Sequence, residues 1–304
     1  MSKTKNSKSK FIFIAAAAIA VIAAISALMP ESVWNGIFIK TGLNPREYES
    51  APMSVHFVDV GQGDCTVITT DDGETVLIDS GEEIKSDIVI KYLENLSVKK
   101  LDYCIVTHPH SDHYGGMLDV LKTYHADNVI LPVMSEINTP DDEYYKAFID
   151  YVKSECGSLL FAEAGDSTEL TDVRIKYYAP VEQMADLNNM SLVAKILYGN
   201  ASFLITGDCS EDEEKDILGK YTQTDLKSNV LKIGHHGSKT ATGEEWLSVV
   251  RPDICVISAG KYNSYNLPSE EMLERLEERN IRYFRTDICG TLVFDCDERG
   301  ITLR

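Results

Sequence analysis

Residues 107–113 read Thr107-His108-Pro109-His110-Ser111-Asp112-His113, directly after an apolar run, 101–106, that has the character of a strand. Three imidazoles and one carboxylate on a single loop would cost several kcal/mol to desolvate unless something binds them. A divalent metal ion is the expected partner, because neutral imidazole and carboxylate suit zinc, manganese or iron. A surface turn that happens to be rich in histidine is the alternative. The stretch therefore predicts a metal site at the end of a strand.

The spacing within this stretch predicts two ions. Alternate residues that leave a strand end, His108 and His110, can converge on one ion, while the pair Asp112-His113 beyond the turn faces a second. Two ions about 3.5–4 Å apart clamp the attacking and leaving oxygens of a hydrolytic displacement, and coordination lowers the pKa of water to about 7. We therefore expect two divalent ions, zinc or manganese, and a metal-bridged hydroxide as the nucleophile.

Acidic residues outnumber basic ones, since the 304 residues carry a formal net charge of −19. The lysines within residues 1–10 are the only charges before Glu31, so the remainder is more acidic still. This balance argues against a broad electrostatic footprint for nucleic acid. It does not exclude a local anion pocket, because a bound metal ion can reverse the local field.

The cysteines predict no disulfide framework. There are seven, an odd number, and no two of them form a Cys-x-x-Cys pair. Four lie in or beside apolar runs and are expected to be buried small hydrophobes: Cys65, Cys104, Cys209 and Cys255. A single bridge between Cys289 and Cys296 across a hairpin stays open as an alternative.

The N-terminal residues 1–30 predict a membrane segment. Residues 1–10 are basic, and Phe11 to Met29 is an apolar run without a charge. Such a length matches a bilayer core, and the basic side should stay in the cytoplasm. A cleaved signal peptide, with Ala24-Ile25-Ser26 as the cleavage site, is the alternative. In both cases the rest of the protein lies outside the cytoplasm, with residues 31–52 as a linker.

The remainder, 53–304, mixes strand and helix patterns in an α/β arrangement. Strands are expected at 54–60, 65–70, 75–79, 101–106, 128–131, 159–162, 173–179, 192–198, 201–206, 230–233, 254–258, 281–285, 291–295 and 301–303. Helices are expected at 84–96, 114–124, 141–156, 211–218, 243–250 and 268–279, the last with Pro268 at its start. This order suits one domain of two mixed sheets packed face to face, with helices outside.

Four further motifs contain polar residues at turns or strand ends. They are Val58-Asp59-Val60-Gly61-Gln62-Gly63-Asp64, Leu77-Ile78-Asp79-Ser80-Gly81, Leu204-Ile205-Thr206-Gly207-Asp208 and Gly234-His235-His236-Gly237-Ser238. The first, taken alone, is as well explained by a glycine turn between strands. Carboxylates at the ends of strands in an α/β protein point at the crevice where ligands bind. These motifs are therefore expected to meet the histidine-rich loop.

Together the motifs resemble those of the metallo-β-lactamase-fold hydrolases, and most closely the subgroup found as the C-terminal domain of the DNA-uptake channel protein ComEC. The resemblance depends on DVGQGD, LIDSG, THPHSDH, ITGD, IGHHGS and YFRTD, which follow in this order between Val58 and Asp287. It implies an αββα four-layer sandwich over residues 53–304, with a dinuclear site along one edge of the two sheets.

The resemblance also implies roles for individual residues. His108 and His110 would hold the first ion, Asp112 and His113 the second, and Asp208 would bridge them. His235 or His236 would complete the second ion; His235 is favoured as the ligand, with His236 near the substrate or leaving group. Asp112, Asp208 and His236 would act in catalysis. Residues expected to support the ligands from behind or to contact the substrate are Asp64, Asp79, Asn189, Ser238 and Lys239. Phosphate oxygens would be held by Lys232, Lys239, Ser238 and Thr240.

Two departures from the resembled family affect these expectations. The third histidine that many relatives supply to the first ion is missing, since only His125 lies in that interval and it is poorly placed. This favours manganese or loosely bound zinc. Where the subgroup has Tyr-Gly-His-Pro, this chain reads Tyr265-Asn266-Leu267-Pro268. His56, inside a strand pattern, is expected to be a core histidine.

The resulting hypothesis is a metal-dependent phosphodiesterase or nuclease that acts on DNA or nucleotides outside the cytoplasm. One alternative is a hydrolase of another ester or amide, lactams included. The other is a membrane-tethered module that binds nucleic acid without cleaving it. The sequence does not identify protein partners.

Overall fold

The computed structural model describes residues 51–304, and the observations below concern that part of the protein. The predicted membrane or signal segment, 1–30, and residues 31–50 of the predicted linker lie outside the described residues. From residue 51 onward, every helix is too short or too polar to cross a membrane.

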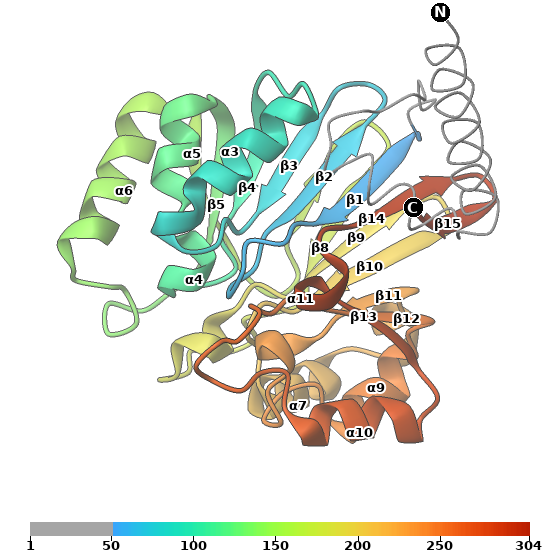
Figure 1. The fold of residues 1–304 in the computed structure, drawn as a ribbon. Coiled ribbons are helices and arrows are strands. Elements are labelled where there is room, and N and C mark those ends of the chain that lie inside the picture. The colour runs from blue at the N-terminus through green and yellow to red at the C-terminus, as the bar shows by residue number, and fades with distance from the viewer. Residues whose placement is uncertain (1–50) are drawn as a thin grey trace, which may run out of the picture. The chain divides into compact units, whose positions relative to one another are not determined.

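Between residues 51 and 304 the chain forms two mixed β-sheets (Figure 1). The first contains, in spatial order, β15 (Gly300–Leu303), β14 (Leu292–Asp297), β1 (Met53–Phe57), β2 (Thr66–Thr70), β3 (Thr75–Ile78), β4 (Leu101–Ile105), β5 (Ala126–Pro132) and β6 (Ser158–Ala162). The second contains β13 (Arg282–Arg285), β12 (Ile254–Ile257), β11 (Val230–Lys232), β10 (Ala201–Ile205), β9 (Ala194–Tyr198), β8 (Arg174–Tyr177) and β7 (Ser167–Glu169).

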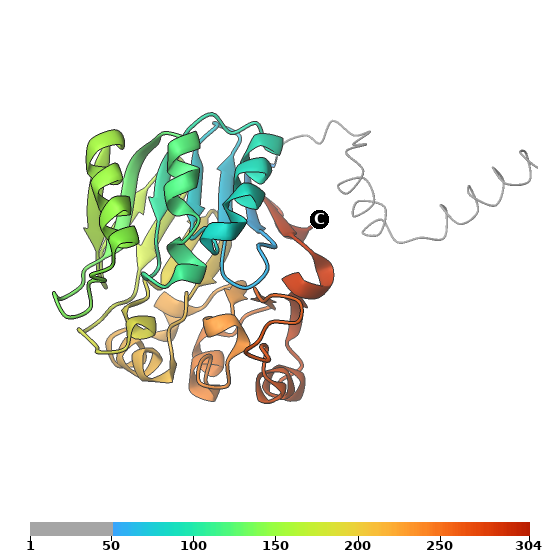
Figure 2. The ribbon, with the colours of Figure 1, turned by 60° about the vertical axis from the view of Figure 1, so that its left-hand side comes forward.

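Helices cover the outer face of each sheet, which gives the four layers (Figures 1 and 2). The first sheet is covered by α3 (Ser86–Asn95), α5 (Met117–Thr123) and α6 (Glu143–Glu155). The second is covered by α7 (Glu211–Lys220), α8 (Gln223–Leu226), α9 (Glu244–Val250) and α10 (Glu270–Glu278). Shorter pieces are α4 (Ser111–Tyr114), α11 (Thr286–Cys289) and the 3₁₀ turns η1 (Glu83–Lys85), η2 (Leu187–Met190) and η3 (Gly234–Gly237). The predicted α/β sandwich is confirmed for the described residues.

Alternation along the strands decides which side chains fill which layer. On β3, Val76 and Ile78 pack between the two sheets, whereas Leu77 packs under the helices of the first sheet. On β10, Phe203 lies between the sheets and Leu204 under the helices of the second sheet. Because side chains in a strand alternate with period two, a strand buried on both faces reads as a continuous apolar run. Each such side chain contributes roughly 1.5–3 kcal/mol by leaving water.

The strand directions bring the polar motifs to one edge of the sandwich. β3 and β4 are parallel neighbours in the first sheet, and β10 and β11 are parallel neighbours in the second. Asp79 follows β3, His108 follows β4, Asp208 follows β10, and His235 follows β11. Carboxyl ends of parallel strands open at the same edge, where ligands bind in open α/β sheets. The fold therefore collects residues that are far apart in the sequence.

Two expectations are wrong in detail. The helix expected over 114–124 is split at Gly115-Gly116, which separate α4 from α5; a Cβ on Gly115 would lie 2.2 Å from the carbonyl oxygen of Ser111, so this close approach requires glycine. The last long helix begins at Glu270, after Ser269, whose Oγ accepts from the amide of Met272. Pro268 precedes this cap.

No disulfide forms among the cysteines, all of which lie in the described residues. The alternative bridge between Cys289 and Cys296 is wrong, since Cys296 is buried in β14 while Cys289 is exposed. The four cysteines expected to be core residues are buried, as predicted: Cys65, Cys104, Cys209 and Cys255.

A buried carboxyl lies in the first turn of α7. The Glu213 side chain is fully buried, its Oε1 accepts from the amide of Val181 at 2.8 Å, and its Oε2 has no hydrogen-bond partner. Burial raises the pKa of Glu213 to about 7. A carboxyl whose pKa is higher in the folded than in the unfolded protein stabilises the fold less as the pH rises from its unfolded-state pKa to its folded-state pKa.

We predict that Glu213→Gln makes stability less sensitive to pH. Glutamine keeps the acceptor for Val181 and replaces the unpartnered oxygen, so it removes the cost of ionisation. The variant should gain free energy of unfolding over wild type as pH rises from about 4.5 to 7, by up to about 3 kcal/mol. Urea unfolding at pH 5 and pH 8 measures this. The control is Glu278→Gln on the exposed face of α10; an equal pH response of the two variants contradicts the assignment.

Candidate metal centre

The Asp79 carboxylate fixes the histidine-rich loop. Its Oδ1 accepts from the amide of Thr107 at 2.8 Å, and its Oδ2 accepts from the Thr107 hydroxyl at 2.6 Å. The same Oδ2 lies 2.8 Å from Nδ1 of His113. An imidazole that donates Nδ1–H to a carboxylate has its Nε2 free to bind a ligand. Asp79 thus supports the loop from behind and aims Nε2 of His113 into the site.

The DVGQGD loop, residues 59–64, also holds the histidine-rich loop, through contacts with the backbone of Asp112. Gly63 has a φ of +116°, and a Cβ on it would lie 2.2 Å from the carbonyl oxygen of Asp112. The next amide, that of Asp64, donates to this Asp112 oxygen at 3.1 Å, and the Asp64 carbonyl accepts from Gly81 at 2.8 Å. Only glycine permits this approach. The motif is therefore a backbone clamp on the metal-binding loop.

Two consecutive histidines after β11 adopt left-handed backbone conformations. His235 has a φ of 48° and His236 a φ of 52°, which costs on the order of 1–3 kcal/mol for each residue. The turn buries His236, whose Nε2 lies 3.2 Å from Oδ2 of Asp112 and 3.5 Å from Oδ2 of Asp208. The His235 side chain stays 30% exposed, with Nε2 3.7 Å from Asp208. Such strain is typical of functional sites.

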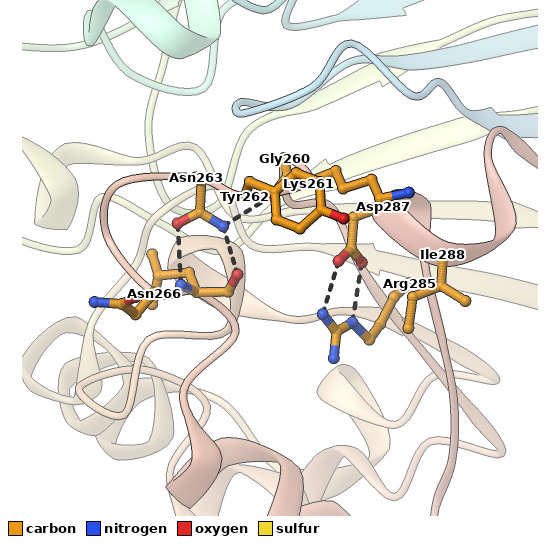
Figure 3. A pocket seen from close by; sticks show the side chains of 9 residues that line it. Gly260, Lys261, Tyr262, Asn263, Asn266, Arg285, Asp287 and Ile288 are labelled. Atoms are coloured by element: carbon orange, nitrogen blue, oxygen red, sulfur yellow. Dashed lines mark hydrogen bonds and ion pairs between the residues drawn. The ribbon is translucent and has the colours of Figure 1, made fainter.

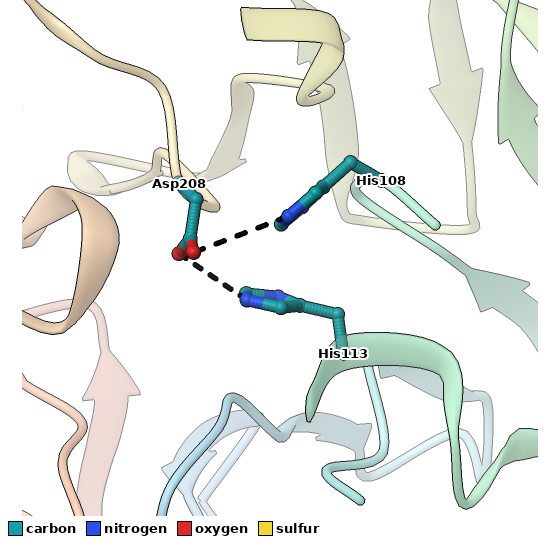
Figure 4. A group of neighbouring side chains, drawn as sticks. All are labelled: His108, His113 and Asp208. Atoms are coloured by element: carbon teal, nitrogen blue, oxygen red, sulfur yellow. Dashed lines mark ion pairs between the residues drawn. The ribbon is translucent and has the colours of Figure 1, made fainter. Parts of the chain in front are cut away.

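Four overlapping groups of side chains converge closely enough to hold a metal ion. In each, the ligand atoms lie within 4.8 Å of one another: His108–His113–Asp208, Asp112–His113–His236, Asp64–Asp208–His236 and Asp64–Asp79–His113. Figure 4 shows Asp208 between His108 and His113, with its oxygens 3.9 Å and 3.2 Å from their Nε2 atoms. All but one of the seven residues are buried; Asp112 is half-buried.

Among the described residues, several polar atoms of this cluster make no hydrogen bond. They are Oδ1 of Asp64, Oδ1 of Asp208 and the Nε2 atoms of His113 and His236, which face one another only at ion-pair distances such as the 3.2 Å between Asp208 and His113. Buried polar atoms nearly always have a partner. Imidazole nitrogen and carboxylate oxygen together suit zinc, manganese or iron. The donor set therefore fits a divalent metal.

The charges of the cluster depend on one another. Burial opposes the charged form of His236, but the carboxylates of Asp208, Asp112 and Asp64 outweigh it and raise the pKa of that imidazole well above its usual range. The pKa of the Asp208 carboxyl is held well below its usual range, because His236 and His113 outweigh the effect of burial. Burial and the neighbouring His113 lower the pKa of His108. The carboxylates thus attract positive charge, for which protons and a metal ion compete.

The cluster opens into a surface hollow. It is lined by Gln62, His110, Ser111, Asp112, Asn188, Asp208, His235, His236, Tyr265 and Leu267. His110 lies at this opening, with Nδ1 3.0 Å from Nε2 of His108, and it belongs to none of the four groups. A substrate that reaches Asp112 and Asp208 must enter through this hollow.

A buried ion pair lies behind the cluster. The Nζ of Lys232 lies 2.5 Å from Oδ2 of Asp64, and both side chains are almost fully buried. Lys232 was expected to hold phosphate oxygens, and this expectation is wrong because its ammonium faces inward. Burial opposes ionisation of Asp64, but Lys232 and then His236 outweigh it and lower the pKa of this carboxyl.

Other expected substrate contacts lie outside the lining of the metal-site hollow. Asn189 is buried, and its Oδ1 accepts from the amide and hydroxyl of Ser210 at 3.0 Å and 2.7 Å. It therefore holds the start of α7, while the neighbouring Asn188 lines the hollow. Ser238 bonds Thr240, and Lys239 is exposed near Glu271, so these residues form a surface turn beside the hollow.

The positions of the remaining histidines agree with expectation. His125 is exposed, pairs with Asp127 at 3.5 Å and lies outside the metal-binding groups. His56 is buried, with Nδ1 2.8 Å from the hydroxyl of Tyr92. The sequence reasoning overlooked Gln62 and Asn188 as lining residues. Gln62 stands within the DVGQGD motif, which is the one signal that pointed to it.

Comparisons with known proteins agree with this architecture. The sequence profile of the Metallo-beta-lactamase superfamily matches residues 58–261. ComE operon protein 3 of Bacillus subtilis is 30% identical over 263 residues, 81% of this chain and 33% of the relative. Competence protein ComA of Neisseria gonorrhoeae is 28% identical over 292 residues, 93% of this chain and 39% of the relative. This chain thus spans little more than a third of these relatives.

A solved structure shows the same fold. The metallo-beta-lactamase fold protein YhfI from Bacillus subtilis matches 77% of this chain and 96% of its own, with a TM-score of 0.50 and 10% identity. The resemblance predicted from the motifs is confirmed. The superfamily match and the groups of histidine and aspartate side chains support a metal-dependent hydrolase with divalent metal ions.

We predict that the two adjacent histidines differ in their effect on metal content. The sequence analysis gave His235 to the second ion, but His236 is the one that faces Asp112 and His113. His236→Ala should therefore lower the bound manganese or zinc per chain, and His235→Ala should retain it. Metal analysis after equilibrium dialysis measures the ions bound per chain in both variants, and each variant is the control for the other. Loss in His235→Ala alone restores the original assignment.

A second prediction concerns the buried ion pair. Lys232→Met leaves the Asp64 carboxylate buried without its cation, which typically costs about 3–5 kcal/mol of stability. The double variant with Asp64→Asn removes both charges, so it should lose less than the sum of the single variants. Urea unfolding at pH 7 measures all three. If Lys232→Met lowers the free energy of unfolding by less than about 1 kcal/mol, the ion pair does not hold the site together.

Proposed function

The chain belongs to the metallo-beta-lactamase superfamily, and from its site we propose that it is a metal-dependent phosphodiesterase acting on DNA or nucleotides. One observation carries the proposal: a buried cluster of Asp112, His113, Asp208 and His236 opens into a hollow large enough for a phosphodiester. The names of the competence-protein relatives support nucleic acid as the substrate.

The distances support most of the residues that would hold two ions. His108 and Asp208 would hold the first, together with His110, which lies outside the four groups but has its Nδ1 3.0 Å from Nε2 of His108. Asp112, His113 and His236 would hold the second, and Asp208 also lies 3.5 Å from Nε2 of His236. Divalent ions bound there would lower the pKa of water and polarise a phosphoryl oxygen. Asp79 would keep Nε2 of His113 directed into the site, since its carboxylate holds the opposite ring nitrogen.

His235 becomes the candidate for contact with the substrate. It lines the hollow, is partly exposed, and leaves the metal-binding position to His236. A neutral imidazole has one N–H, which can donate to a phosphate oxygen or to the leaving oxygen. Leu267, in the same wall, offers an apolar surface where the resembled subgroup has histidine. His235 would therefore be one of the donors that line this opening.

The location of the reaction is a separate proposal. The apolar run from Phe11 to Met29, preceded by lysines, supports a domain anchored on the outer side of the cell membrane. A secreted form after cleavage of that segment is the alternative. Phosphodiesters outside the cytoplasm would then be the accessible substrates.

A non-catalytic binding module is the second candidate function. Leu267 favours it, because the wall of the hollow lacks a polar group at that position. A module of this kind would bind nucleic acid through the rim of the hollow without cleaving it.

We predict metal-dependent cleavage by the purified full-length protein. Bis(p-nitrophenyl) phosphate and labelled DNA should be hydrolysed with manganese and remain intact with a chelator. Asp79→Asn should lower activity about 10–100-fold, because partners of metal-binding histidines typically contribute that much. Exposed Asp141→Asn is the control. Absence of cleavage with manganese, zinc and magnesium contradicts the proposal; DNA binding that survives His110→Ala would then identify a binding module.

A further inference from the structure

The segment 260–268, which follows β12, carries two exposed tyrosines at the rim of the metal site. The side chain of Tyr262 is 93% exposed and that of Tyr265 is 68% exposed. Tyr265 also lines the hollow above Asp112 and Asp208. Large apolar side chains are rarely this exposed without a binding partner when they gather beside a functional site.

This exposure is not a result of a loosely held loop. The side chain of Asn263 bonds four backbone groups: its Nδ2 donates to the carbonyls of Gly260 at 2.9 Å and Leu267 at 2.6 Å, and its Oδ1 accepts from the amides of Tyr265 at 3.1 Å and Leu267 at 3.0 Å. Figure 3 shows Asn263 at the centre of the loop. The tyrosines are therefore presented from a fixed backbone.

Both ends of the segment are joined to the metal site. Gly260 donates its amide to Oε1 of Gln62 at 3.1 Å, and a Cβ on Gly260 would lie 2.6 Å from the Gln62 amide nitrogen. At the other end, the amide of Ser269 donates to the carbonyl of Gly237, directly after His236, at 2.9 Å. The rim thus has a fixed position relative to the metal-binding residues.

The backbone at Tyr262 is unfavourable for a tyrosine. Its φ of 59° lies in the left-handed region, which glycine or asparagine adopts at less cost than a bulky residue. The ring buries almost no surface in return, and Nζ of Lys261 lies 5.5 Å from its centre. Neither backbone preference nor packing explains a tyrosine here, whereas contact with a ligand does.

Two further hollows lie on either side of this segment. One is lined by Lys261, Tyr262, Arg285 and Ile288, with Arg285 held by Asp287 in two hydrogen bonds (Figure 3). The other is lined by Ser238, Lys239 and Tyr265, and also by Glu270 and Glu271. Leu267 borders both of them and the metal-site hollow. The three hollows therefore adjoin at Leu267, and each of the two outer ones has a tyrosine ring and a lysine in its lining.

We propose that Tyr262 and Tyr265 stack on unpaired bases of a single-stranded nucleic acid that crosses the metal site. This inference rests on the proposed function and specifies its substrate. Stacking of one base on an aromatic side chain contributes about 1–3 kcal/mol and tolerates any sequence. Bases in a duplex are already stacked on each other, so they cannot use these rings. Because the protein is acidic overall, rings offer a means of binding that does not need a broad basic surface.

The first test measures binding of a fluorescein-labelled, fully phosphorothioate dT12 to the full-length protein with manganese, by fluorescence anisotropy. Tyr262→Ala and Tyr265→Ala should each weaken binding about 10-fold, and Tyr265→Phe should retain it, because the ring suffices for stacking. The control is Phe161→Ala, which removes an exposed ring on β6 away from the hollows. A phosphorothioate duplex of the same length should bind more weakly than dT12 and respond little to the tyrosine variants.

A second measurement detects contact directly. Ultraviolet irradiation of the complex with an oligonucleotide containing 5-iodo-deoxyuridine should crosslink Tyr262 or Tyr265, identified by mass spectrometry. Wild-type cleavage of DNA together with unchanged dT12 affinity in both alanine variants would overturn the stacking proposal and leave the phosphodiesterase intact. Tyrosine-dependent binding without any cleavage would support stacking and contradict the phosphodiesterase. A protein that binds neither strand form overturns the stacking proposal, while the cleavage assay decides the phosphodiesterase separately.

Discussion

One buried carboxylate holds the site in place. Asp79 stands at the end of β3 with a φ of 57°, fully enclosed, and it receives the amide and hydroxyl of Thr107 from the neighbouring strand end. Its second oxygen also holds Nδ1 of His113. A single side chain therefore sets both the path of the loop after β4 and the direction of its last histidine. Burial raises the pKa of Asp79, and the bonds from His113 and Thr107 counter only part of this effect.

The two sheets are joined by a buried ion pair as well as by apolar packing. Asp64 follows β1 in the first sheet, and Lys232 ends β11 in the second, yet their charged groups lie 2.5 Å apart. Desolvation makes a buried pair of this kind weak support for stability taken as a whole, but removing one partner is costly. The pair instead fixes how the two halves of the site are placed. Asp64 can face Asp208 and His236 only while both sheets keep this relation.

The fold, and the edge of the sheets at which the site lies, could be predicted from the sequence. Short apolar runs with turn residues between them located the strands, and polar residues directly after those runs located the edge at which they meet. It did not distinguish His235 from His236, because the left-handed turn that buries only one of them depends on contacts between Gly237 and Pro268. It also misplaced Lys232. The last residue of a strand can face solvent or protein, and Lys232 faces the interior because Asp64, from the first sheet, pairs with it there.

An acidic protein that acts on a polyanion needs attraction confined to a small area. The carboxylates of the site are enclosed by histidines, Lys232 and, when occupied, metal ions, so their charge is offset before it reaches the opening. The rim then presents the aromatic rings of Tyr262 and Tyr265, with single lysines beside them. In the proposed complex a phosphate would be attracted only at the centre, whereas the flanking nucleotides would be bound by their bases. Such a division would let the remaining surface stay acidic without loss of affinity, and it would exclude duplexes by the same means by which it binds single strands.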